Sequence, residues 1–260
     1  MNGIGIIVPC RVASSRLEKK ALALLDGEPA IDRCLVNCLR VPGVERVILA
    51  TTESAEDDVL ADHTLGGKVD FWRGSTDDVM SRFLGACDKY NLHTVIRVTG
   101  DCPAASWEIA GLLLENHVRS KADCTLARTF AVGTSSDVFS VAALRRIHRH
   151  FRSAMYSEYM SWYFLKNPGY FKMCTVDLPG SWIRNYRLTL DYDEDALMFS
   201  RLFQKLREQG DPADLDKIIA VLDANPEIPA LNSGLPLKYR DDAELIRKLT
   251  EAVTIRGEFI

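Results

Sequence analysis

Ile4-Gly5-Ile6-Ile7-Val8-Pro9 is the stretch that decides the fold of this 260-residue chain. A run of β-branched residues bounded by glycine and proline predicts a strand that is covered on both faces, as in a parallel sheet. The turn after it carries cations and hydroxyls together, namely Arg11, Ser14, Ser15, Arg16, Lys19 and Lys20. Such groups at the end of a buried strand indicate a phosphate site, and a triphosphate is the ligand that we expect there.

Strand-like and helix-like segments alternate through the first half of the chain, which predicts a βαβ protein with a parallel sheet. The expected strands are 4–9, 45–52, 69–73 and 94–99, and the expected helices are 31–39, 55–63 and 77–89. In open α/β sheets, ligands bind in a crevice at the carboxyl ends of the strands. We therefore expect the functional site at that edge.

The pattern changes in the second half of the chain. We expect strands at 124–130, 137–139, 171–176 and 186–191, and helices at 141–150, 157–166, 193–206 and 241–252. The predicted fold class is α/β, with a mixed, mostly parallel sheet between helices in a single domain over 1–260. The part from about 124 to 177 is expected to be an insert for dimerisation or for covering the substrate.

Composition describes one large folded domain, because 47% of the residues are hydrophobic and 26% are charged. The net charge of -4 argues against a nucleic-acid partner, which would need an extended basic face. The seven cysteines are an odd number without a C-x-x-C pair, so we expect reduced thiols. With no signal-peptide pattern and no apolar stretch of the ~20 residues that span a bilayer, we expect a cytoplasmic protein without a membrane partner.

Two aspartates close predicted strands and are candidates for holding a metal ion. Asp101 follows strand 94–99 within Gly100-Asp101-Cys102-Pro103, and Asp191 ends strand 186–191. Capping of a following helix explains Asp101 equally well, since Pro103 suits a first helical turn. Nucleotidyl transfer needs cations for the pyrophosphate, a metal ion and carboxylates to hold that ion. The chain offers this set as Arg11, Arg16, Lys20, Asp101 and Asp191.

The opening residues resemble the R-x-x-S-x-R-L-P-x-K signature of bacterial cytidylyltransferases that activate acidic sugars, through Arg11, Ser14, Arg16, Leu17 and Lys20. The similarity continues in order along the chain, at 50–52, 73–75, 78–79, 82, 97–103, 188–191 and 194–195. The chain is similar to the spore-coat polysaccharide SpsF-like branch of the acylneuraminate and Kdo cytidylyltransferase superfamily. The resemblance implies a Rossmann-like nucleotidyltransferase fold of the GT-A type and a homodimer.

The resemblance also implies a reaction, in which a sugar hydroxyl attacks the α-phosphate of CTP, expels pyrophosphate and leaves a CMP-sugar for surface polysaccharide or glycan assembly. Arg11 and Lys20 would bind the triphosphate with support from Ser14 and Arg16, while Asp101 and Asp191 would hold Mg²⁺. The nucleotide pocket would include Thr51, Arg73, Ser75 and Arg97. The acidic acceptor sugar would lie near Asp137, Glu158 and Tyr159.

The chain departs from the family pattern at a few positions. Glu18-Lys19 stands where Pro-Gly is usual, Ser135 replaces a residue of a G-L-D-V-E-V-F segment, and Ser157-Glu158-Tyr159 replaces R-E-H. Because the last two departures fall where the acceptor would lie, they leave the acceptor sugar open. Two other functions also remain open: transfer from another nucleotide, including a GT-A-type glycosyltransferase, and an inactive nucleotide-binding scaffold subunit.

Overall fold

A seven-stranded sheet forms the centre of the computed structural model, which describes residues 3–13, 17, 19–151, 155–210 and 212–259. The order across the sheet is β5-β4-β1-β6-β8-β7-β9. The strands are β1 (Ile4–Pro9), β4 (Arg46–Thr52), β5 (Asp70–Gly74), β6 (Thr94–Arg97), β7 (Cys124–Ala127), β8 (Asp137–Ser140) and β9 (Met173–Val176). The first four are mutually parallel, β8 is antiparallel to both β6 and β7, and β9 is parallel to β7. The predicted mixed, mostly parallel sheet is confirmed.

Helices cover both faces of this sheet. They are α1 (Ala30–Cys38), α2 (Val79–Tyr90), α3 (Trp107–Ser120), α4 (Val141–Phe151), α5 (Met160–Leu165), α6 (Asp193–Gln209), α7 (Leu215–Ala224), α8 (Glu227–Ala230), α9 (Lys238–Asp241) and α10 (Ala243–Val253). Short 3₁₀ segments occupy Lys20–Leu22, Ala55–Asp62, Ser157–Tyr159 and Gly180–Trp182, and a small ribbon pairs β2 (Leu24–Leu25) with β3 (Glu28–Pro29). No helix in the described part of the chain is both long and apolar enough to cross a bilayer.

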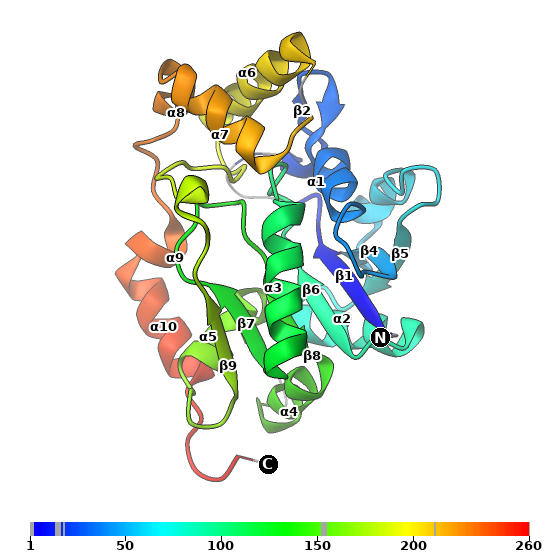
Figure 1. Cartoon of the computed structure of the whole chain (residues 1–260). Helices are drawn as coiled ribbons and strands as arrows, with labels where there is room; N and C mark the ends of the chain where they lie inside the picture. Colours follow the sequence, from blue (N-terminus) through cyan, green and yellow to red (C-terminus); the bar gives the residue numbers. More distant parts are fainter. Residues whose placement is uncertain (1–2, 14–16, 18, 152–154, 211, 260) are drawn as a thin grey trace.

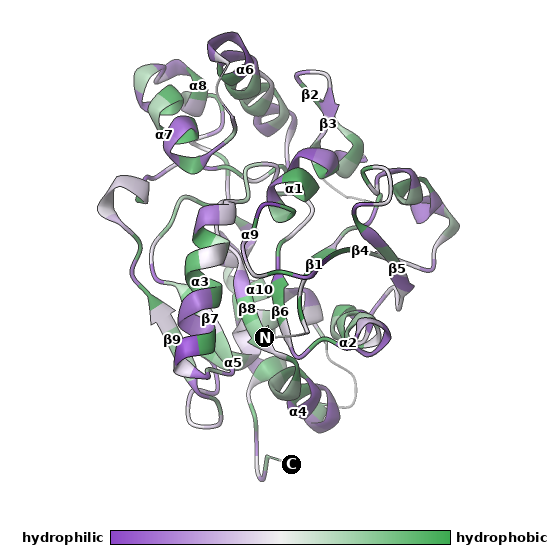
Figure 2. Cartoon of the chain, turned by 45° about the vertical axis from the view of Figure 1, so that its right-hand side comes forward, coloured by the Kyte–Doolittle hydropathy of each residue, from purple (hydrophilic) through white to green (hydrophobic). Residues whose placement is uncertain are grey.

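Alternation along β1 divides the core into two layers. Ile6 and Val8 pack with α1 and α3, whereas Ile7 packs with α2 and α4 on the other face. A third cluster joins α6 and α7 to Leu188 and Leu190. Figure 1 shows α6, α7 and α8 gathered beyond the end of the sheet that is opposite the N-terminus, which is the carboxyl end of β1. The helices are amphipathic, with hydrophilic residues on their outer sides (Figure 2).

The prediction of a last core strand at 186–191 is wrong. This segment makes only an isolated bridge, between Arg187 and Val132, within the described residues. The Leu188 N–H donates to the Val132 carbonyl at 2.6 Å, and the Leu190 N–H donates to the Asp101 carbonyl at 2.8 Å. The alternating leucines are buried against α6 and not in the sheet, which explains why the pattern resembles a strand.

Two other segments differ in detail from their predictions. The helix expected at 55–63 is a 3₁₀ segment, and the 124–177 region contributes β7, β8 and β9 to the central sheet. A role of this region in dimerisation or substrate covering stays a prediction.

Candidate active site

A cavity of about 450 Å³ opens at the carboxyl ends of β1 and β6. The chain places β4 and β5 on one side of β1 and then returns to add β6 on the other, so the strand order reverses at this point. Ligands of open α/β sheets bind at such a reversal. Among the residues singled out from the sequence, those that line the cavity are Arg11, Lys20, Arg97, Asp101, Glu158 and Tyr159.

Lys20 lies at the centre of the charged groups. Its Nζ is 2.6 Å from Asp101 Oδ2 and 2.9 Å from Asp191 Oδ1. Asp101 follows β6, whereas Asp191 precedes α6, and the backbone bond between Leu190 and Asp101 holds the two segments together. The structure therefore brings together a cation and two carboxylates that are 81 and 171 residues away from it in sequence.

The two charges of the Lys20–Asp101 pair stabilise each other. Burial alone would lower the pKa of Lys20, but the Asp101 and Asp191 carboxylates outweigh burial and raise it. Burial alone would raise the pKa of Asp101, but the Lys20 ammonium, together with a hydrogen bond to Thr99 and the charge of Arg97, outweighs burial and lowers it. Both side chains are thus charged at neutral pH.

Asp191 is held in place by a buried network that includes two residues to which no sequence motif pointed, Arg187 and Asn232. Arg187 lies 3.3 Å from Asp191 Oδ2 and 2.9 Å from Asp195 Oδ1. Asp195 has no exposed side-chain surface and accepts hydrogen bonds from the N–H groups of Asp191 and Tyr192, at 2.8 and 3.0 Å. Asn232 donates to Asp195 at 2.8 Å. Of these residues, Asp195 stood in a family motif, at 194–195.

Arg82 supplies a second buried charge, in the wall of the cavity. Its guanidinium donates to the Ser75 carbonyl at 2.8 and 3.0 Å and to the Thr76 carbonyl at 3.4 Å. Burial lowers the pKa of this group. Arg82 thereby shapes the turn whose next residues, Thr76 and Asp77, line the cavity.

Asp57 anchors the loop after β1. This buried carboxylate accepts the Val12 N–H at 2.6 Å and also accepts a hydrogen bond from the Thr52 hydroxyl. Val12 directly follows Arg11, so the 3₁₀ segment that contains Asp57 fixes the backbone next to a predicted phosphate-binding cation. Asp57 lies within the helix predicted at 55–63, and nothing in the sequence singled it out for this role.

Arg97 connects the residues expected near the acceptor. Its guanidinium is 3.3 Å from Asp137 Oδ2 and donates to the Glu158 carbonyl at 2.7 Å. Burial raises the pKa of Asp137 despite the opposing charge of Arg97. Arg97 thus links β6 and β8 to the 157–159 turn, and Tyr159 of that turn lines the same cavity.

Three residues expected in the nucleotide pocket lie outside the lining of this cavity. Thr51 is fully buried in β4, and Arg73 donates to the carbonyls of Thr52 and Ser54 and pairs with Asp58. Ser75 Oγ accepts the Asp78 N–H at 3.1 Å. Ser14 and Arg16 lie outside the described residues.

The oxygen ligands of Asp101 and Asp191 suit a hard cation such as Mg²⁺, which takes few protein carboxylates and completes its shell with phosphate oxygens and water. The part of the chain that the structure describes holds no group of three or more His, Cys, Asp or Glu residues that could hold a metal ion. A Mg²⁺ site formed by these two carboxylates together with triphosphate oxygens therefore fits the described residues better than a site formed by protein ligands alone.

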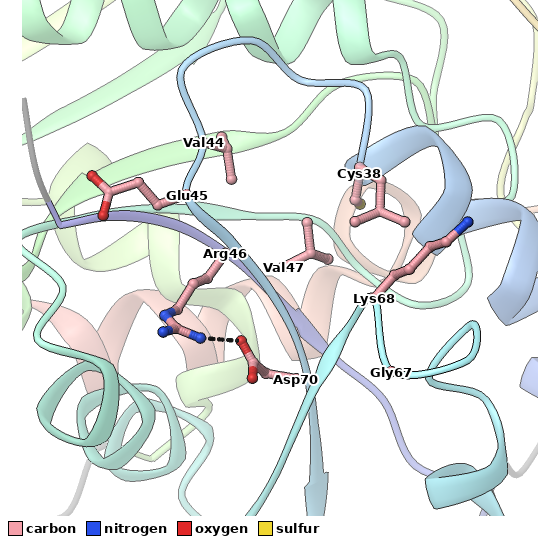
Figure 3. Close-up of a pocket in the computed structure, with 9 residues that line it drawn as sticks. Cys38, Val44, Glu45, Arg46, Val47, Gly67, Lys68 and Asp70 are labelled. Atoms are coloured by element: carbon pink, nitrogen blue, oxygen red, sulfur yellow. Dashed lines mark hydrogen bonds and ion pairs between the residues drawn. The ribbon is translucent and has the colours of Figure 1, made fainter.

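A second cavity, of about 210 Å³, lies at the opposite edge of the sheet (Figure 3). Residues at the beginnings of β4 and β5 line this cavity, and among them Arg46 and Asp70 form an ion pair at 3.0 Å. These are the amino ends of parallel strands, far along the sheet from Asp101. We assign no chemistry to this cavity.

Comparison with known proteins agrees with this geometry. The cytidylyltransferase family model matches residues 5–210. An uncharacterized protein of Methanocaldococcus jannaschii is 31% identical over 94% of this chain and 100% of its own length. The spore coat polysaccharide biosynthesis protein SpsF of Bacillus subtilis is 27% identical over 87% of this chain and 97% of its own.

Solved structures share the fold. A cytidylyltransferase from Leptospira borgpetersenii superposes with a TM-score of 0.77 at 24% identity, over 90% of this chain and 98% of its own. A CMP:2-keto-3-deoxy-manno-octonic acid synthetase in complex with CTP superposes with a TM-score of 0.61 at 16% identity, over 78% and 99%. Since the family model spans most of the chain, the protein belongs to the cytidylyltransferase family as an SpsF-like member and is a nucleotidyltransferase.

Proposed function

We propose that the protein is a Mg²⁺-dependent cytidylyltransferase that forms a CMP-sugar and pyrophosphate from CTP and an acidic sugar. The observation that carries the proposal is the Lys20 ammonium between Asp101 and Asp191 in the cavity at the carboxyl ends of β1 and β6. A triphosphate and its metal ion need such cations and carboxylates. The names of two similar proteins, one solved with CTP and one acting in polysaccharide biosynthesis, support the choice of donor and pathway.

In the proposed reaction, a hydroxyl oxygen of the acceptor forms a bond to the α-phosphorus of CTP. The bond from that phosphorus to its bridging oxygen breaks, pyrophosphate leaves with the electron pair, and the hydroxyl proton passes to solvent. Mg²⁺ held by Asp101 and Asp191 would neutralise charge on the phosphate oxygens. Arg11 and Lys20 bind and orient the triphosphate, and positioning of this kind is most of what phosphoryl chemistry needs from a protein.

An acidic acceptor is supported by Arg97, which lines the same cavity beside Glu158 and Tyr159. The Arg97 side chain is 16% exposed, although it is paired with Asp137. A carboxylate is the acceptor that a guanidinium binds best, so an acid on the sugar would bind the exposed part of this group.

The donor is tested by thermal shift of the full chain with CTP, UTP, ATP and GTP, each with and without Mg²⁺. A ligand at 100 times its Kd adds about 2.7 kcal/mol of stability, which is enough for a shift of several degrees. We expect the largest shift with CTP and Mg²⁺. A larger response to another nucleotide would overturn the assignment of the donor.

Turnover is tested by pyrophosphate release from CTP with a panel of acidic sugars. We expect Asp101→Asn to lower the rate at least about 100-fold, because the amide holds neither Mg²⁺ nor Lys20 as the carboxylate does. Asp177→Asn is the matched control, since Asp177 pairs with Arg128 on the exposed surface. Full activity of the Asp101 variant would refute the metal assignment, and CTP binding without pyrophosphate release from any sugar would favour a scaffold role.

A further inference from the structure

The segment 212–259 lies beyond the residues that the family model matches, yet it reaches the candidate active site. It contains α7 to α10, and Lys238, the first residue of α9, lines the same cavity as Lys20 and Asp101. Figure 1 shows α9 between the α6–α8 group and α10, along one side of the molecule. Motif analysis gave no reason to connect this segment with the site.

The segment is tied down before and after Lys238. On one side, Asn232 donates to the Arg187 carbonyl at 3.0 Å, and Arg187 donates to the Pro236 carbonyl at 3.2 Å. On the other side, Asn167 donates to the Val253 carbonyl and accepts the Ile255 N–H, both at 2.8 Å. Lys238 is thus carried on a backbone anchored to Arg187, the residue that also contacts Asp191.

The charges of the cavity show what Lys238 could do. Lys20 is neutralised by its two aspartates, Arg97 by Asp137, and the Arg82 guanidinium is used on backbone carbonyls. Among the described cations that line the cavity, Arg11, Arg82 and Lys238 have no carboxylate of a described residue within ion-pair distance, and of these three Arg82 is engaged by backbone carbonyls. Arg11 and Lys238, which come from opposite ends of the chain, therefore offer charge without an ion-pair partner to an anionic ligand, beside Lys20, which the proposed function also places on the triphosphate.

We propose that the C-terminal segment completes the triphosphate site and that Lys238 is a further phosphate-binding residue. The inference rests on the proposed function. Lys238 is assigned to the phosphates and not to the acceptor, because the segment that carries Lys238 is anchored on Arg187, which lies beside Asp191. The acceptor side is formed by Arg97 and the 157–159 turn, and Lys238 makes no hydrogen bond to either within the described chain. An ammonium is a sufficient point charge for phosphate oxygens.

The test measures the Kd of pyrophosphate and of CTP, each with Mg²⁺, by isothermal titration calorimetry on the full chain. We expect Lys238→Ala to weaken both ligands about tenfold and Lys238→Arg to stay within about threefold of the wild type. Arg240→Ala is the matched control, because Arg240 lies on the same helix, is exposed and pairs with Asp241 outside the cavity lining. Thermal melting of each variant shows that the fold is retained.

The outcomes separate the inference from the proposed function. Wild-type affinity of Lys238→Ala for both ligands would overturn the inference while the cytidylyltransferase proposal stands. A raised KM for the acceptor sugar with unchanged Kd for CTP would also overturn it, because Lys238 would then serve the acceptor. If the wild-type chain binds neither CTP nor pyrophosphate with Mg²⁺, the proposed function and the inference both fail.

Discussion

Replacing Asp195 should lower the free energy of unfolding more than replacing any acidic residue on the surface around it. The side chain is fully buried and pairs with Arg187, whose own side chain is only 6% exposed. Burial alone would lower the pKa of Arg187, but Asp195 raises it through hydrogen bonds and charge. Without Asp195, Arg187 keeps Asp191 at 3.3 Å as its remaining carboxylate among the described residues.

The magnitude follows from the burial of this pair. Breaking a buried ion pair by removing one partner costs about 3 to 5 kcal/mol, because the other charge stays buried. In a chain of this size, this corresponds to a loss of roughly 6 to 20 °C in Tm. Asp195→Ala also leaves the N–H groups of Asp191 and Tyr192 without their acceptor. Asp195→Asn should cost less, because an amide oxygen in the place of Oδ2 still accepts both of these bonds, while the amide nitrogen loses the bonds that Oδ1 accepts from Arg187 and Asn232.

Urea unfolding followed by circular dichroism measures these differences, with pyrophosphate release measured in parallel. Glu194→Ala is the control, because Glu194 is exposed in the same first turn of α6, and we expect a change within about 0.5 kcal/mol. If Asp195→Ala stays within about 1 kcal/mol of the wild type, Asp195 does not hold Asp191 in place as we argue.

Two further predictions concern the rest of the fold. Burial lowers the pKa of His117 from 6.5 to about 4. Between these two pH values the unfolded chain binds more protons than the folded chain does. The free energy of unfolding should therefore fall by about 3 kcal/mol as the pH decreases from 6.5 to 4. In His117→Gln this loss of stability at low pH should vanish. If urea unfolding between pH 7 and 4 shows the same dependence of stability on pH for the variant and the wild type, the lowered pKa of His117 is contradicted. Gly133 has φ +91, and a Cβ there would overlap the Leu188 carbonyl, so Gly133→Ala should lose at least about 1 to 3 kcal/mol. Gly180→Ala, with open space around it, should melt like the wild type, and equal melting of the two variants would refute the steric argument.

Local patterns in the sequence were sufficient to predict β1, α1, α2 and the parallel part of the sheet. Each of these elements buries an apolar face whose period is written in a few consecutive residues, as in 4–9. The same locality made Asp101 a candidate, because it directly follows β6. The family motifs then indicated cytidylyltransferase chemistry before any contact was known.

The tertiary structure decided which of these residues meet. It showed that 186–191 packs on α6 and is not a strand of the sheet, and that Arg187 and Asp195 present Asp191 to Lys20. It also brought Lys238 from a distant segment to the cavity. None of these contacts leaves a periodic signal in the chain, because ion pairs and buried hydrogen bonds depend on distances between segments far apart in sequence. A strand pattern reports only that alternate side chains are buried, and the packing of the whole molecule determines what buries them.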